Sequence, residues 1–104
     1  MAGQERASKT IVITGVTSGL GLAMKNYFEK QSYIVIGCGR NESKISSLNR
    51  EEKSNRFFVV DVSKDTEVAA WARQVNDQFG PPDILINNAG IINHNANLWE
   101  VAAE

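Results

Sequence analysis

The 104-residue sequence has one cysteine, two prolines and no long hydrophobic run. A single cysteine, Cys38, cannot form an internal disulfide, so we expect a reducing compartment, the cytoplasm. The longest aliphatic stretches are far short of the roughly 20 residues that span a bilayer, and the polar residues 1–9 lack the apolar core of a signal peptide. Eleven basic and twelve acidic residues give a net charge of −1, which offers no surface for nucleic acid or an anionic membrane.

Hydrophobic residues make up 42% and charged residues 22% of the chain, a composition that excludes collagen-like, low-complexity and charge-driven disordered proteins. Short apolar runs alternate with segments of helical periodicity. We expect strands over residues 9–14, 33–38, 56–60 and 83–88. We expect helices over residues 20–32, 41–49 and 63–79. The ends are expected to be a flexible segment over 1–8 and a loop over 91–104 that enters a helix at its end.

Local signals set the helix boundaries. Asn41 is the expected N-cap of the second helix and Ser63 that of the third, whose first turn is suited to the acidic Asp65 and Glu67. Gly80, followed by two prolines, ends the third helix. The apolar face of the first helix is predicted from three- and four-residue spacing, and its members are Leu20, Ala23, Met24, Tyr27 and Phe28.

Strands that are apolar throughout and are joined by helices predict a parallel sheet covered on both faces. Right-handed crossovers leave few topologies, and the doubly wound strand order 3-2-1-4 is the leading one. The predicted fold class is therefore α/β, a partial Rossmann-like sheet with the order β-α-β-α-β-α-β. No repeat or linker interrupts the sequence, so we expect a single domain over residues 1–104.

A glycine-rich segment over residues 14–21 separates the first strand from the first helix. Gly15 permits a tight turn, Gly19 lets the backbone approach a phosphate, and Gly21 lets the helix pack closely on the sheet. The helix N-terminus presents unpaired N–H groups to a pyrophosphate. Further hydroxyl donors are Thr17 and Ser18. A plain structural turn is the alternative, but the position after the first strand of an alternating pattern favours nucleotide binding.

The spacing excludes a P-loop, because Leu20 stands where the second glycine of that motif should be. With Thr-Gly-x-x-x-Gly-x-Gly here and Asn-Asn-Ala-Gly over 87–90 after the fourth strand, the chain resembles the classical short-chain dehydrogenase/reductase family. Asp61 and Val62 after the third strand are a third match. The resemblance covers residues from about 9 to 104, which correspond to the cofactor-binding half of a typical member.

The resemblance implies roles for residues at the strand ends. Asp61 would bind the adenine amino group and Val62 would offer backbone contacts, although Asp61 is also a plausible helix-entry residue. Residues that would line the cofactor ribose and brace the sheet are Asn88, Ala89 and Gly90, with turn formation as the alternative for the asparagines. Leu20 joins this predicted cofactor-binding set.

The end of the second strand distinguishes NADP(H) from NAD(H). An acidic residue there would bind the ribose hydroxyls of NAD and repel a 2′-phosphate, but Gly39 and Arg40 stand at that place. A guanidinium offers forked donors to the phosphate and a flat face to adenine. A solvated surface arginine is the alternative. We expect NADP(H) in preference to NAD(H), and the missing acid also disfavours a methyltransferase.

Catalysis in this family uses an Asn-Ser-Tyr-Lys set, in which the Tyr is the general acid/base and a Lys four residues later lowers its pKa. The chain has only Tyr27 and Tyr33, followed four residues later by Gln31 and Gly37. We therefore identify no catalytic residue and expect the 104-residue chain alone to be inactive. His94 has no second His or Cys nearby, so no metal site is expected, and Cys38 and Trp71 are interpreted as packing residues.

The sequence thus predicts a cofactor-binding fragment of an NADP(H)-dependent oxidoreductase that reduces a small carbonyl compound. Residues 92–100 look similar to pterin-aldehyde reductases of the family. The alternative is a non-catalytic nucleotide-binding module or a truncated regulatory pseudoenzyme. The expected partner is a small carbonyl substrate, with no nucleic acid or membrane, and the full-length parent is expected to be a homodimer or homotetramer.

Overall fold

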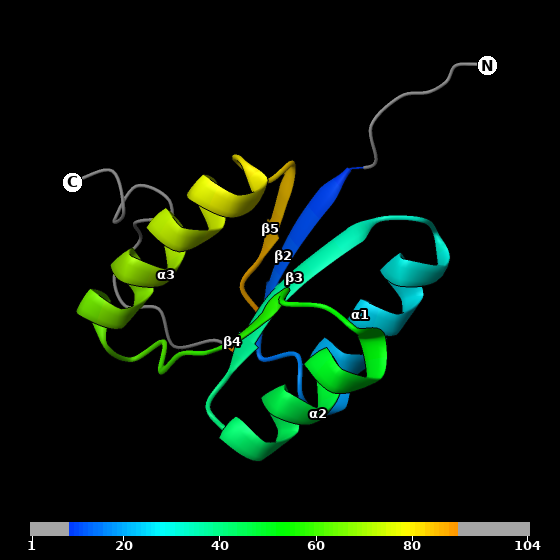
Figure 1. Cartoon of the computed structure of the whole chain (residues 1–104), viewed down its shortest axis with the longest axis horizontal. Helices are drawn as coiled ribbons and strands as arrows, with labels where there is room; N and C mark the ends of the chain where they lie inside the picture. The colour runs from blue at the N-terminus through cyan, green and yellow to red at the C-terminus, as the bar shows by residue number, and fades with distance from the viewer. Residues whose placement is uncertain (1–8, 90–104) are drawn as a thin grey trace.

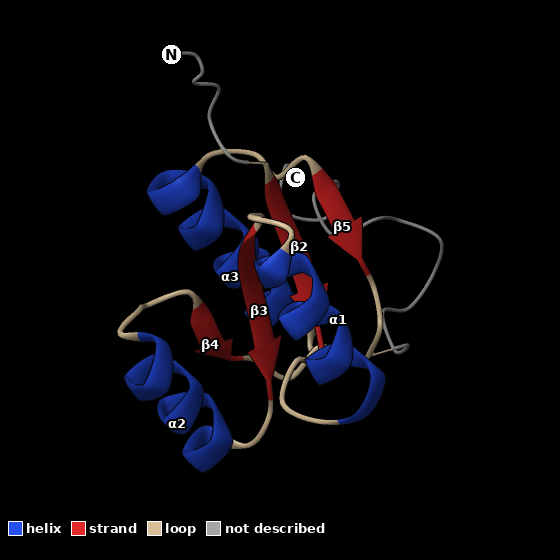
Figure 2. Ribbon diagram, turned by 90° about the vertical axis from the view of Figure 1, so that its right-hand side faces the viewer, coloured by secondary structure: helices blue, strands red, loops and turns tan. Residues whose placement is uncertain are grey.

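The computed structural model describes residues 9–89 (Figure 1). Its strands are β2 (Thr10–Thr14), β3 (Ile34–Gly39), β4 (Phe57–Val59) and β5 (Ile84–Ile86). They form one parallel sheet in the order β4-β3-β2-β5 (Figure 2), which confirms the predicted α/β class and the order 3-2-1-4. The predicted loop, terminal helix and flexible end over 1–8 and 91–104 lie outside the described residues.

Three helices cover the two faces of the sheet: α1 (Gly19–Lys30), α2 (Glu42–Glu52) and α3 (Asp65–Phe79). Helices α1 and α2 lie on one face and α3 lies on the other (Figure 1). Helix α2 runs three residues further than predicted, until Lys53 adopts a left-handed conformation with φ of 51°. None of the helices in residues 9–89 has the length and apolar character needed to cross a membrane.

The core consists of two layers, because successive residues of β2 point to opposite faces of the sheet. Val12 packs with Ile36, Trp71 and Val75 beneath α3. Ile11 and its neighbours pack on the other side beneath α1 and α2. Cys38 and Trp71 are both buried in the α3 layer, which confirms that they are packing residues.

The predicted apolar face of α1 was partly wrong. Leu20 is 68% exposed and Tyr27 is 58% exposed, whereas Lys25 is only 2% exposed. Met24 and Phe28 do pack against the core. The charge of Lys25 is accommodated by carboxylates from two helices, a pairing that hydrophobic periodicity cannot reveal.

Of the two predicted N-cap residues, one is confirmed and the other is wrong. Asn41 caps α2 as predicted, since its Oδ1 accepts a hydrogen bond from the backbone N–H of Lys44 at 3.0 Å. Ser63 does not cap α3, because the helix begins at Asp65 and Lys64 stands at its cap position without a side-chain hydrogen bond. The hydroxyl of Ser63 donates to Asp61 instead. The predicted end of α3 at Gly80 is confirmed.

Candidate functional site

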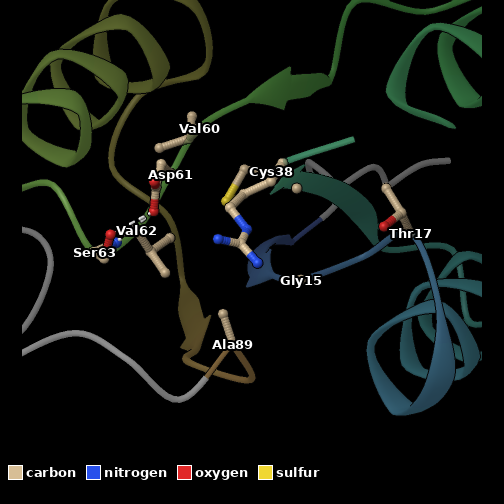
Figure 3. A pocket seen from close by; sticks show the side chains of 10 residues that line it. Gly15, Thr17, Cys38, Val60, Asp61, Val62, Ser63 and Ala89 are labelled. Carbon is tan, nitrogen blue, oxygen red and sulfur yellow. Dashed lines mark hydrogen bonds between the residues drawn. The ribbon is translucent and has the colours of Figure 1, made fainter. Parts of the chain in front are cut away.

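All four strands contribute to one cavity at the carboxyl edge of the sheet (Figure 3), with a volume of about 200 Å³. In open parallel sheets, ligands bind in the crevice outside the carboxyl ends of the strands, where the strand order reverses. Here that reversal lies between β2 and β5. The lining residues are Gly15, Thr17, Cys38, Gly39, Arg40, Val60, Asp61, Val62, Ser63 and Ala89.

The cavity brings together half of the cofactor-binding residues expected from the sequence. Those that line it are Gly15, Thr17, Arg40, Asp61, Val62 and Ala89. The predicted Ser18, Gly19, Leu20 and Gly21 lie at the start of α1, and Gly90 is outside the described residues. Lining residues that were absent from the predicted set are Cys38, Gly39, Val60 and Ser63. Their position at or just after a strand end is the signal that could have found them.

The start of α1 is open to an anion. Ser18 occupies the cap position, but its side chain makes no capping hydrogen bond, and the first turn holds no acidic residue. Gly19 has a φ of +57°, and a Cβ built there would meet no atom within 4 Å. Free backbone N–H groups at a helix N-terminus are suited to a phosphate group. These features fit the pyrophosphate of a dinucleotide.

Gly21 permits the close contact between α1 and the turn after β2. A Cβ built on it would lie 1.7 Å from the carbonyl oxygen of Gly15 and 2.7 Å from Nδ2 of Asn88. No side chain fits in that space. The predicted role of Gly21 in close packing is therefore visible in the geometry.

Hydrogen bonds join the turn after β2 to the segment after β5. The buried Thr14 hydroxyl accepts from the backbone N–H of Ala89 at 2.9 Å and donates to Oδ1 of Asn87 at 3.3 Å. Nδ2 of Asn88 donates to the carbonyl oxygen of Gly15 at 3.1 Å. Thr14 thus braces the cavity, a role that the sequence analysis did not assign to it.

The cavity carries one carboxylate and one guanidinium. Oδ1 of Asp61 accepts hydrogen bonds from the Ser63 hydroxyl at 2.7 Å and from the Ser63 backbone N–H at 3.0 Å. These bonds, with a smaller contribution from the positive charge of Arg40, lower the pKa of Asp61. Among the described residues, no carboxylate forms an ion pair with the exposed Arg40. Its guanidinium is therefore available to a ligand.

Cys38 lines the cavity as a neutral thiol. Burial raises its pKa to about 12, against a smaller opposing effect of a backbone hydrogen bond with Gly15. A protonated thiol is a poor nucleophile. In the part of the chain that the structure describes, no group of three or more His, Cys, Asp or Glu residues could hold a metal ion.

A family model described as "short chain dehydrogenase" matches residues 9–104, nearly the whole chain. The chain belongs to the short-chain dehydrogenase family. Membership of this family implies a nicotinamide cofactor and makes the protein an oxidoreductase by family.

Relatives of this short-chain dehydrogenase support the assignment. The chain is 40% identical over 101 residues to an NADPH-dependent pterin aldehyde reductase of Arabidopsis thaliana, covering 94% of this chain and 42% of the relative. A short-chain dehydrogenase structure from Streptomyces avermitilis is similar, with 26% identity and a TM-score of 0.69 over 79% of this chain and 31% of that one. An actinorhodin polyketide ketoreductase with NADPH has 30% identity and a TM-score of 0.68 over 78% and 33%. The chain thus spans less than half of each relative.

Proposed function

We propose that this chain is the cofactor-binding part of an NADP(H)-dependent reductase and that Arg40 binds the 2′-phosphate of the cofactor. The observation that carries the proposal is the placement of Arg40 at the rim of the strand-end cavity, directly after β3 and without an ion-pair partner among the described residues. The position before it is Gly39, so no carboxylate at the end of β3 opposes a phosphate. The NADPH in the names of two similar proteins agrees with this choice.

The bound cofactor would supply the hydride, and the residues of this chain would hold it. The free N–H groups at the start of α1 would bind the pyrophosphate. Asp61, kept ionised by Ser63, would accept a hydrogen bond from the adenine amino group. The paired loops after β2 and β5, fixed by Thr14, would hold the ribose.

The proposed substrate of the full-length protein is a small carbonyl compound, as for the pterin aldehyde reductase to which the chain is similar. The proton donor for that reaction is proposed to lie outside this chain. Tyr27 lies on α1 and Tyr33 packs against the core beneath α1 and α2, and neither lines the cavity. We therefore propose that the 104-residue chain alone does not turn over NADPH.

The cofactor assignment is tested by replacing Arg40 in the full-length protein. Arg40→Ala removes a charge-assisted contact worth about 1.5–3 kcal/mol, so NADPH should bind about 10- to 100-fold more weakly. NADH lacks the 2′-phosphate, and its affinity should change less than about two-fold. Fluorescence titration of both cofactors measures the two dissociation constants. Arg50→Ala, an exposed arginine on α2, is the matched control and should change neither.

Equal losses for NADPH and NADH would show that Arg40 only stacks on adenine or supports the fold. A wild type that binds NADH as tightly as NADPH would overturn the assignment. Conversely, Gly39→Asp combined with Arg40→Ala should reverse the preference. A Cβ at Gly39 would lie 2.9 Å from Cγ2 of Thr17, so this variant should also carry Thr17→Ser, with Thr17→Ser alone as its control.

A further inference from the structure

Helix α2 directly follows Arg40 and Asn41 in the sequence. It packs on the sheet through few apolar side chains. Ile45 is its only buried residue. The face of α2 toward α1 borders an open groove of about 470 Å³. That face consists of Ser43, Lys44, Ser47, Leu48, Glu51 and Glu52. Ile45 and the partly buried Leu48 pack against the core and set the depth of α2 on the sheet, while polar contacts near its C-terminal end contribute to its direction.

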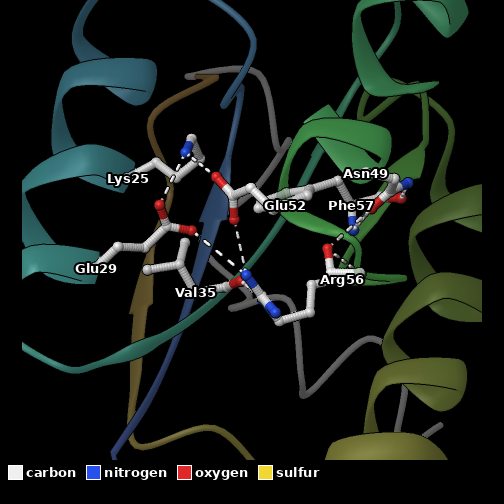
Figure 4. Close-up of polar contacts among 8 residues, drawn as sticks. Lys25, Glu29, Val35, Asn49, Glu52, Arg56 and Phe57 are labelled. Atoms are coloured by element: carbon white, nitrogen blue, oxygen red, sulfur yellow. Dashed lines mark hydrogen bonds and ion pairs between the residues drawn. The ribbon is translucent and has the colours of Figure 1, made fainter. Parts of the chain in front are cut away.

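Four charged side chains form a cluster beside this groove, namely Lys25, Glu29, Glu52 and Arg56 (Figure 4). Lys25 and Glu52 also line the groove. Nζ of Lys25 pairs with Oε1 of Glu29 at 2.9 Å and with Oε2 of Glu52. Nη2 of Arg56 lies 2.7 Å from Oε1 of Glu52 and 3.5 Å from Oε2 of Glu29. Within the described residues, Lys25–Glu52 is the only ion pair that joins α1 to α2.

The cluster is fastened to the sheet by hydrogen bonds of fixed direction. Nε of Arg56 donates to the carbonyl oxygen of Val35 in β3 at 3.0 Å. One turn before Glu52, Asn49 bonds both the carbonyl oxygen and the N–H of Phe57 in β4, at 2.9 and 3.1 Å. The C-terminal end of α2 is thus fixed relative to α1, β3 and β4.

Buried ion pairs often add little stability compared with apolar side chains, but they require one geometry. If α2 pivots on Ile45, four residues or about 6 Å from the cap residue Asn41, a tilt of about 10° moves Asn41 by about 1 Å. A charge-assisted hydrogen bond is normally about 2.7–2.9 Å long, so such a shift breaks it. Because Arg40 directly precedes the cap residue Asn41, a change in the direction of α2 would shift Arg40 relative to the cavity.

We propose that the Lys25–Glu52 pair sets the direction of α2 and so positions Arg40 toward the phosphate of NADP(H). The inference rests on the proposed function of Arg40. Lys25 is then a positioning residue for cofactor discrimination. It lies on α1, across the groove from α2, and acts on Arg40 through the direction of α2.

The test is the double variant Lys25→Met/Glu52→Met in the full-length protein. It removes Lys25 as a partner of Glu29 and Glu52 as a partner of Arg56, but leaves Glu29 and Arg56 as an opposite-charge pair at 3.5 Å. The dissociation constant of NADPH should rise about ten-fold, the loss of one charge-assisted contact, while that of NADH changes less than about two-fold. Unfolding of part of the sample would reduce the binding of both cofactors equally, so their ratio separates positioning from stability. Lys30→Met/Glu51→Met is the matched control, because both residues are exposed on the same two helices, and it should leave the ratio unchanged.

If the double variant does not fold, Glu52→Gln keeps the side-chain shape and should lower the NADPH preference by a smaller factor. An unchanged ratio in the folded variant, or an equal loss for both cofactors, overturns the inference while leaving the proposed function intact. A wild type without preference for NADPH overturns both.

Discussion

Gly21 occupies the point where α1 crosses the turn after β2, with the carbonyl oxygen of Gly15 in the place that a Cβ would need. An alanine inside a helix is normally favoured over glycine by about 1 kcal/mol. At this position the contact at 1.7 Å is with backbone, which cannot rotate away as a side chain can. Packing and helix propensity therefore act in opposite directions.

We predict that Gly21→Ala destabilises the protein by about 2 kcal/mol, because overpacking of this kind costs more than the gain in helix propensity. Denaturant unfolding of the folded protein measures the change. Asn26→Ala, an exposed position on the same helix, should stay within about 0.5 kcal/mol of the wild type. An unchanged or raised stability of Gly21→Ala would show that the turn can shift.

Several residues of the site were predictable because their signals are local. Gly21 and Gly15 belong to one short motif, and Asp61 directly follows a strand. Thr14 was missed because its partners, Asn87 and Ala89, are 73 and 75 residues away. The sequence shows a threonine at the end of a strand. It does not show which distant backbone N–H donates a hydrogen bond to the hydroxyl of that threonine.

At the level of elements, α1 was predicted as a helix and Met24 and Phe28 do pack against the core, but its apolar face was predicted only in part. Apolar spacing placed Leu20 and Tyr27 inward, whereas the structure buries Lys25. Burial alone would lower the pKa of Lys25, but hydrogen bonds from its ammonium group to Glu52 and Glu29 outweigh this effect and raise it. The ammonium stays charged, and its partners on α2 could not be assigned from periodicity within α1.

The hydrogen bond between Ser63 and Asp61, just before α3, leads to a prediction on pH dependence. Ser63→Ala removes the hydroxyl that donates to Asp61, so the pKa of Asp61 should rise toward its ordinary value of about 3.9. Since the folded-state pKa lies below the unfolded one, Asp61 contributes stability above the unfolded pKa and loses it as pH falls through the folded pKa. The loss begins near the unfolded pKa in both proteins, but the variant should lose a smaller contribution and complete the loss at higher pH than the wild type.

Carboxyl NMR titration of Asp61 in both proteins checks this expectation. Ser46→Ala, an exposed serine on α2, should leave the titration unchanged. Identical titrations for wild type and Ser63→Ala would show that the backbone N–H of Ser63 is a sufficient donor by itself.

For the molecule as a whole, the strand order was predictable because right-handed crossovers leave few arrangements. The same order leaves β5 paired only with β2 among the described residues, with Ile84 39% exposed. An apolar strand edge is a template for pairing with another chain. The sequence showed that this strand is apolar, but not how much of Ile84 is exposed at the edge of the sheet.

We predict that the isolated 104-residue chain self-associates through β5 and that Ile84→Lys shifts it toward monomer, because a charge on an edge strand opposes pairing. Sedimentation velocity at several concentrations measures the distribution. Tyr27→Lys replaces an exposed apolar side chain on a helix and should not change it. A wild-type chain that sediments as one monomer and melts cooperatively would instead support an autonomous binding module.

The hydrogen bond between Thr14 and Ala89 also has a consequence for biosynthesis. The glycine-rich turn is made early, but the cavity wall that Ala89 provides is made last. At about 5–20 residues per second, the ribosome needs about 1–6 s to add the 28 residues between Asp61 and Ala89. During that interval the nascent chain holds most of the cavity-lining residues without the contact to Ala89. Under the proposed function, the complete nucleotide cavity would exist only after β5 has emerged.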